Sequence, residues 1–389
     1  MQIAKSSKFL SFLSFLIIFA LENTVEEMKL HIFNPEHDIA LATHVRRFTA
    51  PHSARQLRSE MGFLPALWAE DGDVVLVDDI PAAERRLNRL RRYVAKVDLV
   101  SLNDASSLHH LHEHLDEIDG VEPWGWDNAV VENLIKSNLP TCLIPNEKRL
   151  EEIRQLSNRK WASEHLLPQV VESNISLIGE SHHITSFEEL AEKVSDGGRY
   201  VLKAPWSSSG RGIRYVSHND HWLRNQTWAH HVIERQGGIM LEPYYNKVKD
   251  FGMEFTAHKD GSVSYDGLSL FQTINGAYSG SIIDTEQAKT ELLERFVSST
   301  LLEDVRNLIC NILQRELHSR YQGPLGVDMM IVSDSDNHFL LHPCVELNLR
   351  RTMGHVALSF EVDETMPRRL MRIIYTDKYH FRVSMVKKP

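Results

Sequence analysis

Residues 346–350 read ELNLR, and this short stretch decides how the rest of the chain is interpreted. Glu346, Asn348 and Arg350 are spaced by two, so on a β-strand their side chains lie on one face. Apolar neighbours indicate a largely buried strand, in which a glutamate without a partner would be costly. Mg²⁺ prefers oxygen ligands such as carboxylates. We therefore expect Glu346 and Asn348 to bind a metal, and either that metal or Arg350 to balance the charge of Glu346.

The strand before it is expected over residues 326–332, where GVDMM contains Asp328. Together the two strands predict a hairpin, on which Asp328 could supply a second carboxylate to the same metal. The turn between them, SDSDN, resembles a calcium loop but lacks its glycine and distal glutamate, so we interpret it as a solvated turn. Further predictions are a hairpin around the Asp-Gly at 260–261, helical segments over 146–167 and 221–236, and one long helix over about 286–318.

A second informative segment, KAPWSSSGRG, follows an apolar strand that ends at Lys203. It is not a Walker A loop, because the lysine precedes the glycines. Small side chains would still let backbone N–H groups approach phosphate oxygens, while the cationic side chains offset their charge. The alternative is a flexible hairpin with an exposed lysine. The loop residues that would surround phosphate are Ser207, Ser208, Ser209, Gly210, Arg211 and Gly212.

Between these segments, the sequence LEPYY at 241–245 leaves an expected strand and enters a proline-containing connector. Such a connector could offer backbone hydrogen bonds to adenine. Glu242 or Asp250 could accept hydrogen bonds from ribose hydroxyls. The alternative is an ordinary hinge between domains.

The N-terminal part alternates short β-branched strands with helical segments, which predicts an α/β layer with parallel strands. A dense polar cluster follows its first strand, at the carboxyl end where α/β sheets bind ligands. This cluster is a candidate for substrate contact; the alternative is a polar loop that caps a helix, with Asp38 near the helix N-terminus. Its members are Asn34, Glu36, His37 and Asp38.

In this order, KAPWSSSGRG, MLEPYY, GVD and ELNLRRTMG resemble the ATP-grasp superfamily, most of all its carboxylate–amine ligase-type members. The resemblance implies an α/β preATP-grasp-like domain over residues 28–144, after an apolar extension over 1–27. It also implies an α+β ATP-grasp fold, with a first subdomain and its small lid over 145–240 and a larger core subdomain over 241–389.

The resemblance implies ATP and Mg²⁺ as cofactors. Lys160 and Lys203 would bind the phosphates beneath the 207–212 loop, and Arg350 would stabilise the transferring phosphoryl group, with Lys203 and Arg350 as the catalytic residues. The adenine hinge would include Glu242, Tyr244 and Tyr245, with Asp250 nearby. Asp328, Glu346 and Asn348 would hold the metal.

The implied activity is that of a ligase, which phosphorylates a carboxylate to an acylphosphate for attack by an amine or similar nucleophile. Two alternatives remain: a kinase that phosphorylates a small molecule, and a nucleotide-binding module without turnover. The intact lysines and metal ligands count against the module.

Composition limits the class of protein. A length of 389 residues favours two or three domains, and a net charge of −10 argues against a nucleic-acid partner. Three separated cysteines indicate a reducing compartment. The apolar run at 9–21 resembles a signal peptide but is short for a membrane span and lacks a cleavage site. We expect a cytoplasmic protein that effectively begins at Met28, without a stable membrane partner; a homodimer is the default assembly, and export is the alternative to the cytoplasm.

Overall fold

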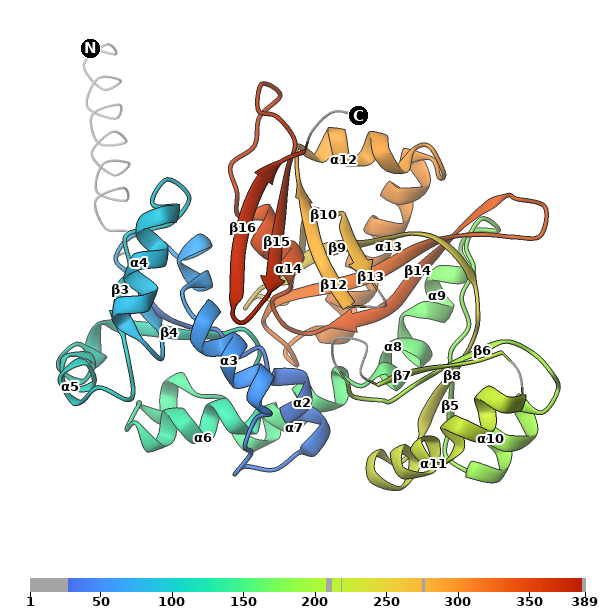
Figure 1. The fold of residues 1–389 in the computed structure, drawn as a ribbon, viewed down its shortest axis with the longest axis horizontal. Helices are drawn as coiled ribbons and strands as arrows, with labels where there is room; N and C mark the ends of the chain where they lie inside the picture. Colours follow the sequence, from blue (N-terminus) through green and yellow to red (C-terminus); the bar gives the residue numbers. More distant parts are fainter. Residues whose placement is uncertain (1–26, 208–211, 218, 275–276, 387–389) are drawn as a thin grey trace, which may run out of the picture.

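The computed structural model describes residues 27–207, 212–217, 219–274 and 277–386. In Figure 1 the N-terminal part, in blue and teal, lies beside a central body in orange and red, and a smaller green and yellow layer lies against the other side of that body. The described strands form four sheets of four strands each. No described helix combines the length and the apolar character needed to cross a lipid bilayer.

The first sheet confirms the predicted parallel α/β layer. Its strand order is β3-β2-β1-β4, and every neighbouring pair is parallel. The carboxyl ends of these strands meet at one edge, so the loops that follow them are brought together there. Its strands are β1 (Met28–Ile32), β2 (Val74–Leu76), β3 (Asp98–Val100) and β4 (Ile118–Pro123), and its helices are α2 (His37–Thr43), α3 (His52–Met61), α4 (Ile80–Leu90), α5 (Ala105–Glu113) and α6 (Asn128–Lys136).

The second sheet is the small antiparallel layer, with strand order β5-β8-β6-β7. Helices α10 and α11 pack against it, and α8 (Arg159–His165) contacts its edge strand β5; its buried core includes Leu190, Leu202 and Ile239. Lys203 is the last residue of its strand β6. The elements are β5 (His182–Ile184), β6 (Tyr200–Lys203), β7 (Ile213–Val216) and β8 (Ile239–Pro243), with α10 (Phe187–Val194) and α11 (Asn219–Gln236).

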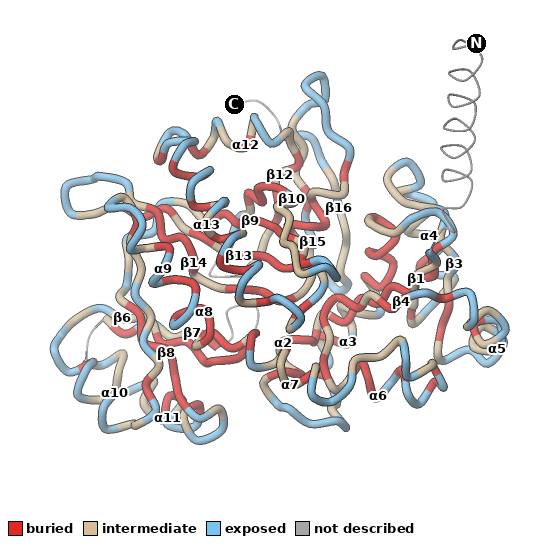
Figure 2. Tube along the Cα trace, turned by 180° about the vertical axis from the view of Figure 1, so that it is seen from behind, coloured by how far each residue is buried: buried red, intermediate tan, exposed pale blue. Residues whose placement is uncertain are grey.

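The third sheet lies at the centre of the molecule and contains both predicted hairpins. Its order is β10-β9-β13-β14, antiparallel throughout. In Figure 2 much of β9 and β13 is red, because these strands are largely buried. The large apolar core of this region includes Phe251, Phe255 and Val327. The strands are β9 (Asn246–Ala257), β10 (Val263–Ser269), β13 (Gly323–Ser333) and β14 (Phe339–Asn348). Helices near them are α7 (Glu147–Leu156), α8 (Arg159–His165) and α9 (Leu167–Val171).

The prediction of one long helix over 286–318 is wrong. The segment forms α12 (Glu286–Leu293) and α13 (Ser299–Leu317), separated by a short turn. Ser298 caps the second helix, because its side chain accepts a hydrogen bond from the backbone N–H of Leu301. Serine side chains compete with helical hydrogen bonds in this way, and buried Leu293 and Val297 anchor the turn between the helices. The helical pattern over 146–167 is likewise divided, with Asn158 capping α8.

The fourth sheet connects the C-terminal part of the chain to the N-terminal part. Its order is β11-β12-β15-β16, and β16 packs against α3. The backbone N–H of Tyr379 donates to Glu60 Oε2 at 2.6 Å. The strands are β11 (Phe271–Ile274), β12 (Ala277–Ile283), β15 (Arg369–Tyr375) and β16 (Tyr379–Met385); α14 (Met353–Leu358) precedes the last two.

Candidate active site

The three residues predicted to bind metal converge on the β13–β14 hairpin. Asp328 and Glu346 lie directly opposite each other in the register of the two strands. Asn348 lies two residues further along β14, and its Nδ2 donates to Asp328 Oδ2 at 3.1 Å. Burial, together with the nearby charges of Glu346 and Glu254, raises the pKa of Asp328 to about 8. A divalent cation would relieve this crowding of carboxylates, and the oxygen ligands offered fit Mg²⁺.

Glu254 is a third carboxylate beside the hairpin, and the sequence analysis missed it. It is buried on β9, where burial raises its pKa. Thr352 Oγ1 donates to its Oε2 at 2.9 Å, and His355 Nδ1 lies 3.1 Å from the same oxygen. The only available signal was a lone polar residue within an apolar strand, which does not by itself indicate a site.

Arg350 joins the end of the hairpin to Asp38 in the first turn of α2. Its Nε lies 3.0 Å from Asp38 Oδ1, and its Nη2 lies 2.9 Å from Asp38 Oδ2. Nη2 also donates to Asn348 Oδ1 at 2.9 Å. Burial alone would raise the pKa of Asp38, but the guanidinium group opposes that effect and the pKa is lowered. Two segments that are far apart in sequence therefore meet in one charged contact.

Arg159, rather than Arg350, is the partner that the structure gives to Glu346. Its Nη2 lies 2.5 Å from Glu346 Oε1. Its Nη1 donates to the Ala204 carbonyl at 2.6 Å and to Ser207 Oγ at 2.7 Å. Arg159 is buried at the start of α8, whereas Lys160, which the resemblance favoured, is partly exposed with its Nζ 3.8 Å from Glu164. One guanidinium group thus links the β13–β14 hairpin to the start of the serine-glycine loop.

Lys203 lies in the same region but already has a carboxylate partner. Its Nζ is 2.6 Å from Glu242 Oε2 and donates to the Val345 carbonyl at 3.3 Å. Glu242 also accepts a hydrogen bond from Ser181 Oγ at 3.0 Å. The lysine therefore connects the small sheet to β14. In the loop after it, Ser207 and Gly212 are described, while Ser208, Ser209, Gly210 and Arg211 lie outside the described residues.

The other residues predicted around adenine and ribose lie along the exit from β8 and on β9. Tyr244 is partly exposed, with the Arg199 guanidinium 4.1 Å from its ring centroid. Tyr245 lies against His342 at 5.6 Å between ring centroids, and burial raises its pKa to about 12. Asp250 is bound by Lys247 Nζ at 2.6 Å and by Thr273 Oγ1 at 3.0 Å.

A small cavity of about 20 Å³ lies between the first turn of α2 and the β13–β14 hairpin. His37 and Asp38 line one side, and Arg159, Glu346 and Asn348 line the other. Asn34 and Glu36, the other two members of the predicted polar cluster, do not line this cavity. Asn34 and His37 both contact Asp127 Oδ2 at 3.0 Å, and Glu36 pairs with Arg58.

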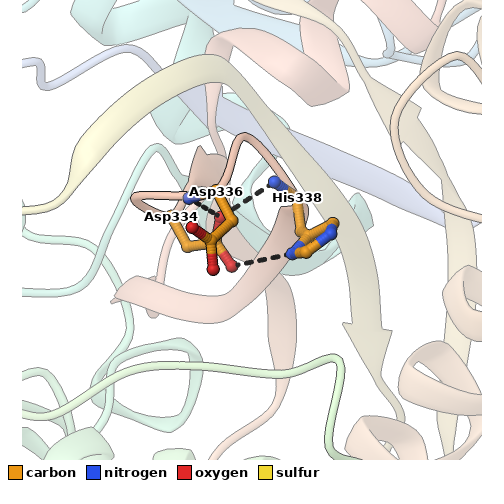
Figure 3. A group of neighbouring side chains, drawn as sticks. All are labelled: Asp334, Asp336 and His338. Atoms are coloured by element: carbon orange, nitrogen blue, oxygen red, sulfur yellow. Dashed lines mark hydrogen bonds and ion pairs between the residues drawn. The ribbon is translucent and has the colours of Figure 1, made fainter.

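The turn between β13 and β14 forms a separate polar group of Asp334, Asp336 and His338 (Figure 3). Asp334 accepts hydrogen bonds from the backbone N–H groups of Asp336 and His338 at 2.9 and 2.8 Å, and His338 Nδ1 lies 3.2 Å from its second oxygen. These bonds within the turn account for the grouping, and the residues are largely exposed. The arrangement agrees with a solvated turn.

No protein-family model and no curated protein sequence matches the chain. Among solved structures, the biotin carboxylase domain of Hydrogenobacter thermophilus 2-oxoglutarate carboxylase, crystallised with MgADP, ADP and bicarbonate, superposes with a TM-score of 0.52 at 14% identity. The alignment covers 89% of this chain and 74% of that one. The chain has the ATP-grasp fold. The fold class expected from the sequence motifs is therefore confirmed.

Two further solved structures align over similar lengths. The N5-carboxyaminoimidazole synthetase of Staphylococcus aureus, complexed with ADP, has a TM-score of 0.48 at 14% identity, over 89% of this chain and 82% of that one. A putative ATP-grasp superfamily protein from Archaeoglobus fulgidus has a TM-score of 0.47 at 13% identity, over 93% of this chain and all of that one (100%). At such identities the likeness concerns the fold alone.

Proposed function

We propose that this protein is an ATP-dependent ligase that activates a carboxylate as an acylphosphate for attack by an amine or similar nucleophile. Mg-ATP would bind between the segments 145–240 and 241–389. The observation that supports this function most is the small cavity in which Glu346, Asn348, Arg159 and Asp38 meet. It brings oxygen ligands for a metal, a cation for phosphate and the first turn of α2 to one place.

Asp328, Glu346 and Asn348 would hold Mg²⁺, which when bound would offset the negative charge of the phosphates. Around them three positive charges come from separate segments: Arg159 at the start of α8, Lys203 at the end of β6 and Arg350 after β14. Phosphoryl transfer requires positioning and charge neutralisation more than covalent chemistry from the protein. Arg350 is held by Asp38 and Asn348, and Arg159 by Ala204 and Ser207, so both guanidinium groups are already oriented.

The pairing of Lys203 with Glu242 suits a site that loads an anionic ligand. A buried lysine without a partner would be costly, and Glu242 supplies that partner at 2.6 Å. Phosphate oxygens that approached Lys203 would share or replace this contact, and Glu242 would keep its hydrogen bond from Ser181. We propose the cytoplasm, where ATP is available, as the location of this reaction, and a homodimer as the assembly.

The test is ADP release from Mg-ATP in the presence of carboxylates and amines supplied in pairs. A condensed product supports the ligase, and a phosphorylated small molecule would show the kinase alternative instead. We expect Glu346→Gln to lower turnover by at least about 100-fold, because the variant loses a metal ligand and leaves Arg159 without its charged partner.

A matched control is Glu303→Gln, since Glu303 is exposed on α13, where its carboxylate pairs with the neighbouring Arg306. It should retain the turnover of the unaltered protein. Full activity of Glu346→Gln, with a folded protein by circular dichroism, would contradict the assignment of the site.

A further inference from the structure

A second, larger cavity of about 320 Å³ lies in the N-terminal part, away from the metal hairpin. It opens at the carboxyl ends of β1, β2 and β3, and α6 closes its other side. The volume falls at the lower end of the range for small-molecule pockets, which also form preferentially at this edge of α/β sheets. The position and the size are therefore those of a binding site for a small metabolite.

One buried carboxylate in this cavity has an unused acceptor. Glu36 is only 5% exposed and lines the cavity. Its Oε1 pairs with Arg58 Nη1, whereas its Oε2 has no hydrogen-bond partner. An unsatisfied buried acceptor costs free energy, and for a charged group the cost is larger. A hydrogen-bond donor from a ligand would remove that cost.

The other charged groups of the cavity are already engaged. Asp127 accepts from Asn34, from His37 and from two backbone N–H groups at the start of α6. Arg58 contacts Glu36 and also lies 3.5 Å from Asp78, so its charge is shared between two carboxylates. Lys136 is largely exposed and lies 3.2 Å from Glu132. Glu36 Oε2 is thus available as a hydrogen-bond acceptor. The lining has more carboxylates than cationic side chains, so the cavity favours a cationic ligand over an anionic one.

Apolar side chains form the rest of the wall. Phe33, Val77, Leu102 and Leu134 surround the polar groups. Pockets of this kind bind the apolar body of a ligand through the walls and orient it through a few polar contacts. The occupant therefore combines a positively charged donor with a hydrocarbon portion.

We propose that this cavity binds a small molecule that carries a protonated amine on an apolar body, with the ammonium group donating to Oε2 of Glu36. The pair of His37 and Asp127 separates the two cavities: Asp127 lines the larger one and His37 the smaller one. In the proposed ligase this occupant is the amine substrate, and that identification alone rests on the proposed function. Binding of the amine does not require ATP.

The experiment is a calorimetric titration of the full chain, without nucleotide, against the twenty amino acids and simple alkylamines. Each binder is compared with the analogue that lacks its amino group, such as leucine with 4-methylpentanoate. We expect at least one amine to bind, and the analogue without the amine to bind at least about 10-fold more weakly, a difference of about 1.4 kcal/mol. Glu36→Gln should weaken binding of the amine to a similar extent.

Two further variants keep this test decisive. Ala129→Leu adds side-chain volume to the wall of the cavity without altering Glu36, and it should also weaken binding; it decides the question if Glu36→Gln does not fold. Glu113→Gln on α5 is the matched control and should bind normally, since Glu113 does not line the cavity.

Equal affinity for the analogue without an amine, unaltered affinity in Glu36→Gln and Ala129→Leu, or absence of binding by every amine in the series would overturn the proposal. Its failure is distinguishable from failure of the ligase. Amine binding with no ADP release would contradict the ligase and leave the cavity assignment standing. ADP release by a protein whose amine binding is unaltered in the Glu36 and Ala129 variants would support the ligase and contradict the cavity assignment.

Discussion

At the scale of single residues, Asp328 combines burial with two neighbouring carboxylates. It is opposed by Glu346 and lies near Glu254, and the charge of Arg350 and the amide hydrogen bond from Asn348 compensate only in part. Its pKa is therefore about 8, far above that of an ordinary aspartate. Without a cation, the carboxyl group keeps a proton at neutral pH in the folded protein and loses it in the unfolded chain.

This difference predicts how stability depends on pH. Between the unfolded pKa and about 8 the native state binds the additional proton, so the free energy of unfolding falls as pH rises and levels off above about 8. The contribution of this group approaches about 1.4 kcal/mol per pH unit in that window. Asp328→Asn should remove it. Urea unfolding at pH 5 to 9, without metal or nucleotide, measures the difference; parallel profiles for the two proteins would contradict the assignment.

At the scale of elements, the start of α14 is built around the buried carboxylate Glu254. Thr352 caps the helix and also donates to Glu254, and His355 completes a capping box with Thr352. Gly354 lies in this first turn, and a Cβ there would come 1.8 Å from Glu254 Oε1 and 2.5 Å from Ser269 Oγ. A side chain at this position cannot be accommodated without displacing Glu254.

Gly354→Ala should therefore destabilise the protein by about 1–3 kcal/mol or more, as expected for overpacking of a closed core. Displacement of Glu254 would also disturb the neighbouring Asp328, so we expect weaker metal binding. Gly120→Ala on β4 is the matched control, because its nearest atom would be 4.0 Å away on a lysine side chain. Thermal unfolding of the two variants tests this; equal melting temperatures would show that α14 adapts freely.

At the scale of the whole molecule, the C-terminal hairpin β15–β16 holds the N-terminal part against the rest. One apolar cluster contains Met61 and Phe63 from the N-terminal part together with Phe360 and Met371 from the C-terminal part. Asp38 belongs to the first of these parts and Arg350 follows the central sheet. The geometry of the candidate site therefore depends on this distant apolar contact as well as on its own ion pair.

Met371→Ala should cost about 2–5 kcal/mol, since Met371 is fully buried in this cluster. Because the cluster spans two parts of the fold, the variant should also lower ADP release at temperatures well below its melting temperature. Met385→Ala on the same hairpin is the control, since Met385 is 73% exposed. Loss of stability with fully retained turnover would mean that the site does not depend on this contact.

The sequence alone predicted whatever depends on local pattern. Alternation placed Glu346 and Asn348 on one face of β14, Asp-Gly and SDSDN marked two hairpins that the structure confirms, and strand and helix periods indicated the parallel N-terminal layer. The expectation that Arg350 shares that strand is wrong, because β14 ends at Asn348. Local pattern failed where two helical segments were joined across a turn, because apolar periodicity continued through residues 294–298 while Ser298 started a new helix.

Only the tertiary structure decided which charges meet. Arg159 and Glu346 are 187 residues apart, and Arg350 and Asp38 are 312 residues apart, yet each pair is in direct contact. No local period records such a contact, since it arises when separate sheets pack and buried charges find partners. The same holds for the free oxygen of Glu36, which can be recognised only after its surroundings are in place. The ELNLR stretch thus determined the chemistry of its strand, and the packing of the whole chain determined its partners.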